Sequence, residues 1–116
     1  SKNKNLKIIP PLDYLKFINL LSSSYFLITD SGGLQEEASF FGKPLLILRK
    51  KTERMEVVNI GLAKLINPNN NDIIKEVNLL LNNKRLYKKM AKKSLIYGDG
   101  FASKRIIIHI KKYLKI

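Results

Sequence analysis

The chain has 116 residues, enough for one α/β domain with a hydrophobic core, and residues 1–116 are expected to form that single domain. It has no cysteine and one histidine, which excludes disulfides and thiol chemistry and argues against a histidine-based metal site or catalytic triad. Its net charge of +13 is uneven: residues 1–60 carry nine basic and six acidic side chains, whereas residues 61–116 carry thirteen and three.

Strand-like and helix-like patterns alternate along the chain. Strands are predicted at residues 6–9, 25–29, 45–48 and 62–66, and helices at 13–21, 34–41, 53–59, 72–81, 86–93 and 102–114. Gly42 is expected to end the second helix, and residues 97–100 are expected to form a turn. This order predicts an α/β fold, a Rossmann-like parallel sheet with helices on both faces.

The basic second half has two interpretations. Excess positive charge suits nucleic acid or an anionic membrane surface, so a basic nucleic-acid or membrane-surface module stays an alternative function. Lys, Asn and Ile are abundant together, as in an AT-rich genome, and no aromatic residues interleave with the lysines as a single-strand platform requires. We therefore expect no specific nucleic-acid partner. No apolar run approaches a membrane span, so we expect no membrane partner either.

The chain is expected to be a piece of a longer, cytoplasmic protein. It begins without an initiating Met, and its first residues do not form a signal-peptide pattern.

Residues 27–38 (LITDSGGLQEEA) are the stretch most suggestive of function. They combine the end of a buried strand, a glycine turn and a helix N-terminus, and such a turn binds anions because free N–H groups point outward. Gly32 and Gly33 permit backbone angles closed to other residues and let a phosphate approach the backbone. Taken alone, residues 30–33 also fit an ordinary turn with a helix cap, and that interpretation stays open.

Several stretches together resemble one family, the non-hydrolysing UDP-N-acetylglucosamine 2-epimerases. The resemblance covers essentially the whole chain, and the order and spacing of its motifs agree. It rests on residues 29–38 (TDSGGLQEEA), 42–44 (GKP), 52–54 (TER), 97–100 (YGDG) and 13–17 (DYLKF).

The resemblance implies the C-terminal, UDP-binding half of a two-domain GT-B arrangement. It implies that UDP is eliminated across C1 and C2 of the sugar, which leaves the sugar as a glycal, and that UDP then adds back with C2 inverted. The acid/base groups of that reaction would come mostly from a missing N-terminal domain, so no catalytic residue is assigned in this chain. The resemblance also implies a UDP-sugar substrate, no cofactor or metal, and a homodimer of the full-length enzyme.

The resemblance implies UDP-binding roles for individual residues of the matching motifs. Ser31, Gly32 and Gly33 would hold the diphosphate, which is also the leaving group. Glu37 would accept hydrogen bonds from the ribose hydroxyls, as an acidic residue does in dinucleotide-binding folds. Without a ligand, Glu37 is also explained as a carboxylate that suits the helix dipole.

Two further residues are candidates for contacting UDP. Arg54 would pair with phosphate as a planar fork, or is an ordinary surface arginine. Phe17 would lie against the uracil, or is a core aromatic of the first helix. The sequence departs from the family where Lys50 replaces a usual Asp and Met55 replaces a usual Pro.

A second alternative function is the donor-binding half of a GT-B glycosyltransferase, which is close in class to the epimerase. A GT-B glycosyltransferase also has a glycine turn and a Glu-rich helix at this position. The 52–54 segment favours the epimerase.

Overall fold

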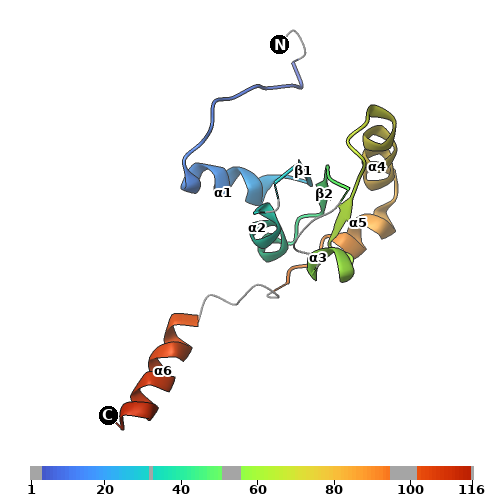
Figure 1. Cartoon of the computed structure of the whole chain (residues 1–116). Coiled ribbons are helices and arrows are strands. Elements are labelled where there is room, and N and C mark those ends of the chain that lie inside the picture. The colour runs from blue at the N-terminus through green and yellow to red at the C-terminus, as the bar shows by residue number, and fades with distance from the viewer. Residues whose placement is uncertain (1–3, 32, 51–55, 95–101, 116) are drawn as a thin grey trace.

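The structure is a computed structural model that describes residues 4–31, 33–50, 56–94 and 102–115 (Figure 1). Its strands are β1 (Leu27–Thr29), β2 (Leu45–Ile47) and β3 (Ala63–Leu65). Its helices are α1 (Tyr14–Ser23), α2 (Leu34–Phe41), α3 (Glu56–Asn59), α4 (Asn70–Asn82), α5 (Lys84–Met90) and α6 (Ala102–Leu114). The predicted turn at residues 97–100 lies outside the described residues.

The three described strands form a parallel sheet in the order β1-β2-β3. Leu27 is in register with Leu45, and Leu45 with Ala63. At the end of the ladder, the Leu48 N–H donates to the Thr29 carbonyl at 2.7 Å, so the carboxyl ends of β1 and β2 meet at one edge. The predicted parallel sheet is confirmed.

Helices cover both faces of this sheet, also as predicted. Successive strand residues point to opposite faces, and all residues of β2 are buried. Leu45 and Ile47 pack with Ala38 of α2. Leu46 packs on the other face with Leu80 of α4 and Met90 of α5. β2 is therefore the centre of the core. α2, the helix that directly follows the glycine turn, packs against one face of β2.

The strand predicted at residues 6–9 is not formed. These residues run extended and exposed, with Ile8 83% exposed. A strand is stable only when a neighbour shares its backbone hydrogen bonds. In the described structure residues 6–9 pair with neither of the edge strands, β1 and β3. The apolar pattern of residues 6–9 therefore does not by itself determine that they join the sheet.

The helix ends follow local chemistry. Gly42 ends α2 in the left-handed conformation, with φ 68°, as predicted. A Cβ at Gly42 would lie 2.9 Å from Cγ of Lys93, so a side chain there would also clash. α4 begins two residues earlier than predicted because the Asn69 side chain accepts from the Asp72 N–H at 2.9 Å.

Tyr87 fastens α5 to the segment before β1. Its ring stacks on Tyr25 with centroids 4.0 Å apart, and its hydroxyl donates to the Tyr25 carbonyl at 2.7 Å. Tyr87→Phe keeps the stack and removes the hydrogen bond, so we expect the free energy of unfolding to fall by about 1 kcal/mol at neutral pH. Urea unfolding measures this, with Tyr113→Phe as control because Tyr113 is 86% exposed. Equal effects of the two variants would refute the assignment.

The difference in the free energy of unfolding between the parent chain and Tyr87→Phe should also depend on pH. Burial, and to a smaller extent Tyr25, raises the pKa of Tyr87 above its ordinary value of 10.0. The folded chain therefore holds this proton more tightly than the unfolded chain. Its contribution is complete below pH 10.0 and is lost as the pH rises through the raised pKa. The difference in the free energy of unfolding between the parent chain and Tyr87→Phe should become smaller at high pH.

Candidate functional site

The turn between β1 and α2 is braced by its own hydroxyl groups. The Ser31 N–H donates to Oγ1 of Thr29 at 3.0 Å, and the Gly33 N–H donates to Oγ of Ser31 at 3.2 Å. These short-range bonds fix the turn before any ligand binds. Thr29 therefore supports the turn at the end of β1. Sequence reasoning could have found Thr29, because a hydroxyl two residues before an amide is a known turn signal.

Gly33 caps α2 with an ordinary backbone conformation. Its φ is −68° and ψ is −26°, which any residue can adopt. Among the described residues, a Cβ there would meet Oγ of Ser31, at 3.6 Å. The expectation that these glycines adopt angles closed to other residues is therefore wrong for Gly33, and Gly32 lies outside the described residues. The fold does not require glycine at position 33, which leaves approach of a ligand as a reason for it.

Glu37 presents an unsatisfied acceptor one turn into α2. Its Oε2 atom is buried and has no hydrogen-bond partner in the described structure. Buried polar atoms are nearly always paired, and one left unpaired costs stability. Two positions earlier on the same helix, Gln35 is fully buried. Among the described residues, Glu37 is thus a carboxylate with one buried oxygen that has no hydrogen-bond partner.

The remaining predicted site residues have different outcomes. Phe17 lies half-buried on α1, and α1 packs against α2. Phe17 and Glu37 thus come from neighbouring helices. Ser31 and Gly33 are exposed at the turn. Arg54 lies outside the described residues.

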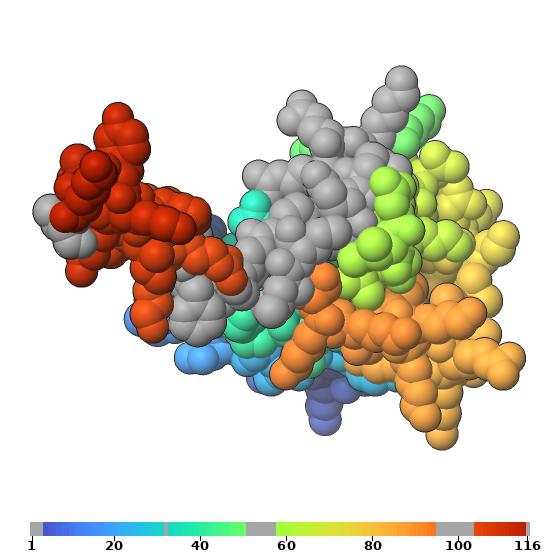
Figure 2. Space-filling view, turned by 90° about the horizontal axis from the view of Figure 1, so that it is seen from below, coloured from blue at the N-terminus to red at the C-terminus, as the bar shows by residue number. Residues whose placement is uncertain are grey.

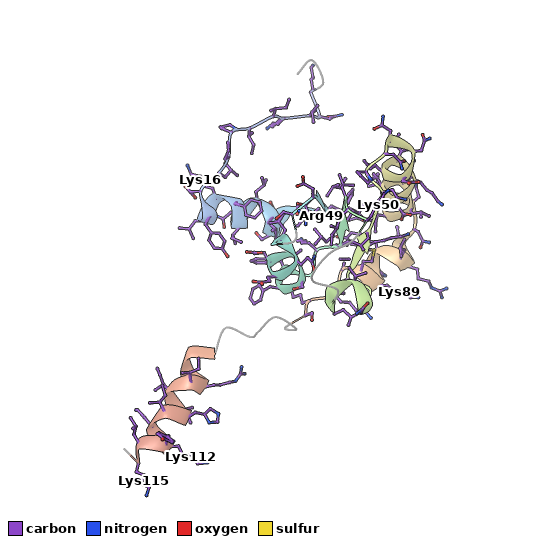
Figure 3. All side chains as sticks on the ribbon, viewed as in Figure 1. Lys16, Arg49, Lys50, Lys89, Lys112 and Lys115 are labelled. Atoms are coloured by element: carbon purple, nitrogen blue, oxygen red, sulfur yellow. The ribbon has the colours of Figure 1, made fainter. Side chains whose placement is uncertain are left out.

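Arg49 is a candidate that the sequence reading did not single out. It is exposed and directly follows Leu48, whose N–H bonds to the Thr29 carbonyl at 2.7 Å. A cation therefore stands where β2 ends, next to the end of β1. Figure 3 shows Arg49 and Lys50 on a different part of the molecule from Lys89 of α5 and Lys112 of α6. The sequence feature that could have identified Arg49 is its place directly after a buried strand, at the edge where parallel sheets bind ligands.

Among the described residues, two surface hollows lie away from the turn, along α4, α5 and the residues beside them. One, of about 420 Å³, is lined by Lys84, Arg85, Lys88, Lys89 and Lys92. The other, of about 400 Å³, is lined by Lys75, Asn78, Leu79, Asn82 and Asn83. Neither includes the glycine turn. We place the candidate site at the turn because its chemistry is specific there, whereas the hollows are lined by ordinary surface side chains.

The described residues include neither a cluster of metal-ligating side chains nor a membrane-spanning helix. Within residues 4–31, 33–50, 56–94 and 102–115, no group of three or more His, Cys, Asp or Glu side chains is placed to hold a metal ion. None of the described helices has the length and apolarity needed to cross a membrane.

The parallel sheet, the braced turn at its carboxyl edge and the unpaired carboxylate are typical of α/β domains that bind anionic nucleotides. A sequence profile of the UDP-N-acetylglucosamine 2-epimerase family matches residues 1–111. The chain belongs to this family.

Curated relatives agree with the profile. The chain is 48% identical over 103 residues to UDP-N-acetylglucosamine 2-epimerase of Campylobacter jejuni, covering 89% of this chain and 27% of that protein. It is 42% identical over 109 residues to the Yersinia pestis enzyme of the same name, covering 94% of this chain and 29% of that protein. The chain thus spans less than a third of these relatives.

Solved structures show the same fold. The S. aureus MnaA–UDP co-structure superposes with a TM-score of 0.88 at 46% identity, over 98% of this chain and 31% of that chain. UDP-GlcNAc 2-epimerase from Neisseria meningitidis bound to UDP-GlcNAc superposes with a TM-score of 0.82 at 43% identity, over 90% of this chain and 28% of that chain. The Rossmann-like fold expected of a GT-B half is confirmed.

Proposed function

We propose that this chain is the UDP-binding half of a UDP-N-acetylglucosamine 2-epimerase. The full enzyme would interconvert UDP-GlcNAc and UDP-ManNAc. The observation that carries the proposal is the buried, unpartnered Oε2 of Glu37 behind a braced glycine turn. The relatives solved with UDP or UDP-GlcNAc support it.

The turn would hold the diphosphate. Gly33 leaves room beside the backbone, and the N-terminus of α2 favours negative charge. Ser31 would donate its hydroxyl hydrogen, since its Oγ already accepts from the Gly33 N–H. Arg49 and Arg54 would add positive charge from the segment after β2.

Glu37 would bind the ribose. A vicinal diol offers two O–H donors, and a carboxylate offers two acceptor oxygens in matching geometry. Binding would thus satisfy the Oε2 atom that is unpaired in the free chain. Phe17, on the helix packed against α2, would lie against the uracil.

The proposed reaction breaks the bond between C1 and the diphosphate oxygen. A base removes the C2 proton, the C1–C2 double bond of a glycal forms, and the electron pair of the broken bond leaves on UDP. In the return step UDP adds to C1 and a proton is delivered to the opposite face of C2. This chain's role is to stabilise the charge that develops on UDP.

The proton-transferring groups would lie in an N-terminal domain that this sequence does not contain. We therefore propose that the 116-residue chain is inactive alone. The complete enzyme would work as a homodimer in the cytoplasm. The comparisons favour the epimerase over a glycosyltransferase half, since the profile and the relatives are epimerases.

Titration with UDP, followed by amide chemical shifts, tests the binding site. We expect shifts at Ser31, at residues 33–37 and at Phe17. Gly33→Val should remove them while circular dichroism stays unchanged, because the backbone angles at Gly33 suit any residue. Shifts confined to α5 and reproduced by pyrophosphate alone would indicate general charge attraction and would contradict the proposal.

Activity is tested in a chimera in which this chain replaces the aligned segment of the C. jejuni relative. We expect the chimera to convert UDP-GlcNAc and to incorporate deuterium from D₂O at C2. A folded chimera that binds UDP but incorporates no deuterium would contradict the proposed reaction.

A further inference from the structure

The hollow on α5 carries charge of one sign. It measures about 420 Å³, and its described lining consists of five cationic side chains. α5 lies at the surface of the face shown in Figure 2, in orange, and Figure 3 shows Lys89 pointing away from the body that contains the sheet. All five side chains are exposed. They are Lys84, Arg85, Lys88, Lys89 and Lys92, and we call them the α5 cationic cluster.

The α5 cationic cluster has no ion-pair partner within the described residues. Residues 77–94 contain no Asp or Glu. The carboxylate of Glu76, just before them, already pairs with Lys64 at 2.7 Å. Within α5, two like-charged pairs stand four residues apart, which destabilises a helix. A bound anion would relieve this repulsion. The two pairs are Lys84 with Lys88 and Arg85 with Lys89.

The fold places an aromatic stack at the border of this cluster. Tyr87 follows Lys84 by three residues on α5, so the two side chains are neighbours on the helix surface. Tyr25, 62 residues away in sequence, stacks on Tyr87 with ring centroids 4.0 Å apart. Tyr25 is still 49% exposed. An exposed aromatic ring therefore lies beside the cations, which the order of residues along the chain did not show.

The chemistry of the cluster favours nucleic acid over other polyanions. Four of its five members are lysines, which are depleted in the interfaces between proteins. A basic helix that binds a membrane surface directs an apolar face toward the lipid, whereas Leu86 and Met90 of α5 pack in the core. Cations that follow a backbone beside an aromatic ring are typical of proteins that bind single strands.

We propose that α5 binds a single-stranded nucleic acid, with phosphates along the α5 cationic cluster and one base stacked on Tyr25. The strand is single because a base inside a duplex is already stacked on both sides. Contacts with phosphate position a strand without reading its bases, so the binding has no sequence preference. This activity goes beyond the proposed binding of UDP, since the hollow does not include the glycine turn.

Salt dependence tests the contacts with phosphate. Fluorescence anisotropy follows a labelled oligo(dT) strand of about 12 nucleotides as it binds the 116-residue chain. Five phosphate contacts predict that the logarithm of the binding constant falls with the logarithm of the salt concentration with a slope of about −3.5. The double variant Lys88→Gln, Lys89→Gln should bring the slope to about −2.

The control for this measurement is the double variant Lys111→Gln, Lys112→Gln. It removes the same charge from α6 and should keep the slope of the parent chain. Equal slopes for the two double variants would show general attraction by the net charge and would overturn the proposal. Absence of binding to oligo(dT) at low salt would also overturn it.

A second set of variants tests the stacking of a base on Tyr25. Tyr25→Leu should weaken the binding of oligo(dT) at least about fivefold. Tyr25→Phe should leave it unchanged, because this variant keeps the ring and the carbonyl that accepts from Tyr87. Tyr113→Leu is the control, since Tyr113 is 86% exposed on α6. Equal affinity of Tyr25→Leu and the parent chain for oligo(dT) would overturn the proposal.

Inorganic polyphosphate, which has no bases, shows whether Tyr25→Leu has kept its folded surface. It should bind Tyr25→Leu and the parent chain equally. If Tyr25→Leu also loses polyphosphate, Tyr25→Phe and the salt slopes still decide the proposal, because neither depends on that variant.

Anionic phospholipid vesicles test the competing interpretation of the cluster. Binding to phosphatidylserine vesicles that is tighter than binding to oligo(dT) in the same buffer, and that requires Lys88 and Lys89, would overturn the proposal in favour of a membrane surface. UDP-induced amide shifts at residues 33–37 should be the same in the parent chain and in both double variants. The proposed UDP site is thus tested separately from the nucleic-acid site.

Discussion

Replacing Ile47 by Ala is expected to destabilise the chain by about 2–5 kcal/mol, enough to unfold a large share of the molecules. Ile47 is 0% exposed in the central strand β2 and packs with the core on the α2 face. The substitution removes three buried carbons and leaves a cavity that neighbouring side chains fill only in part. A sheet of three short strands has little stability in reserve.

Urea unfolding followed by circular dichroism at 222 nm measures this loss. Ile28→Ala is the matched control, because Ile28 is also a strand residue but is 43% exposed on the edge strand β1. We expect the control to lose less than half as much stability. Similar losses for the two variants would show that β2 is not the centre of the core.

Glu37→Gln is expected to weaken UDP binding by about 10- to 100-fold. Hydrogen bonds to a charged group contribute about 1.5–3 kcal/mol, and each 1.4 kcal/mol is tenfold in affinity. Gln keeps the size of the side chain but replaces one acceptor oxygen by a donor, which cannot pair with a ribose O–H that donates.

An opposing effect is smaller. Removing the negative charge also relieves repulsion of the diphosphate, but this repulsion acts across the whole ribose, whereas the hydrogen bonds are direct contacts, and Coulomb energy falls with distance. The net result is weaker binding. Stability should be nearly unchanged, since the buried Oε2 has no partner to lose.

Isothermal titration with UDP measures the effect of Glu37→Gln. Glu36→Gln is the control, because it makes the same change at the adjacent, exposed position. We expect the control to bind within about twofold of the parent chain. Tighter binding by Glu37→Gln would mean that charge repulsion dominates and that Glu37 does not hold the ribose.

Most elements could be predicted because their signals are local. The helix at residues 34–41 was predicted with the bounds that α2 has, and Gly42 ends it as expected. The strands at Leu27–Thr29 and Leu45–Ile47 lie within the apolar runs that predicted them. Periodicity and turn residues act over a few positions, so they are readable without the fold.

The family and the outline of the site were also readable from the sequence. The motifs at residues 29–38 and 42–44 led to the epimerase family, which the profile over residues 1–111 confirms. The roles assigned to Ser31, Gly33 and Glu37 remain predictions. The structure adds a reason for two of them: Gly33 is free of any backbone requirement, and Glu37 has an unpaired oxygen.

Only the tertiary structure decided which apolar segments find a partner. Residues 6–9 and one side of α6 also carry large apolar side chains, yet these are exposed while β2 is buried. Burial depends on what lies across from a segment in space, and a local pattern carries no information about that. The sequence by itself determined the elements, the turn chemistry and the family. The tertiary structure determined that β2 is the core, that Thr29 braces the turn, and that α6 presents an uncovered face.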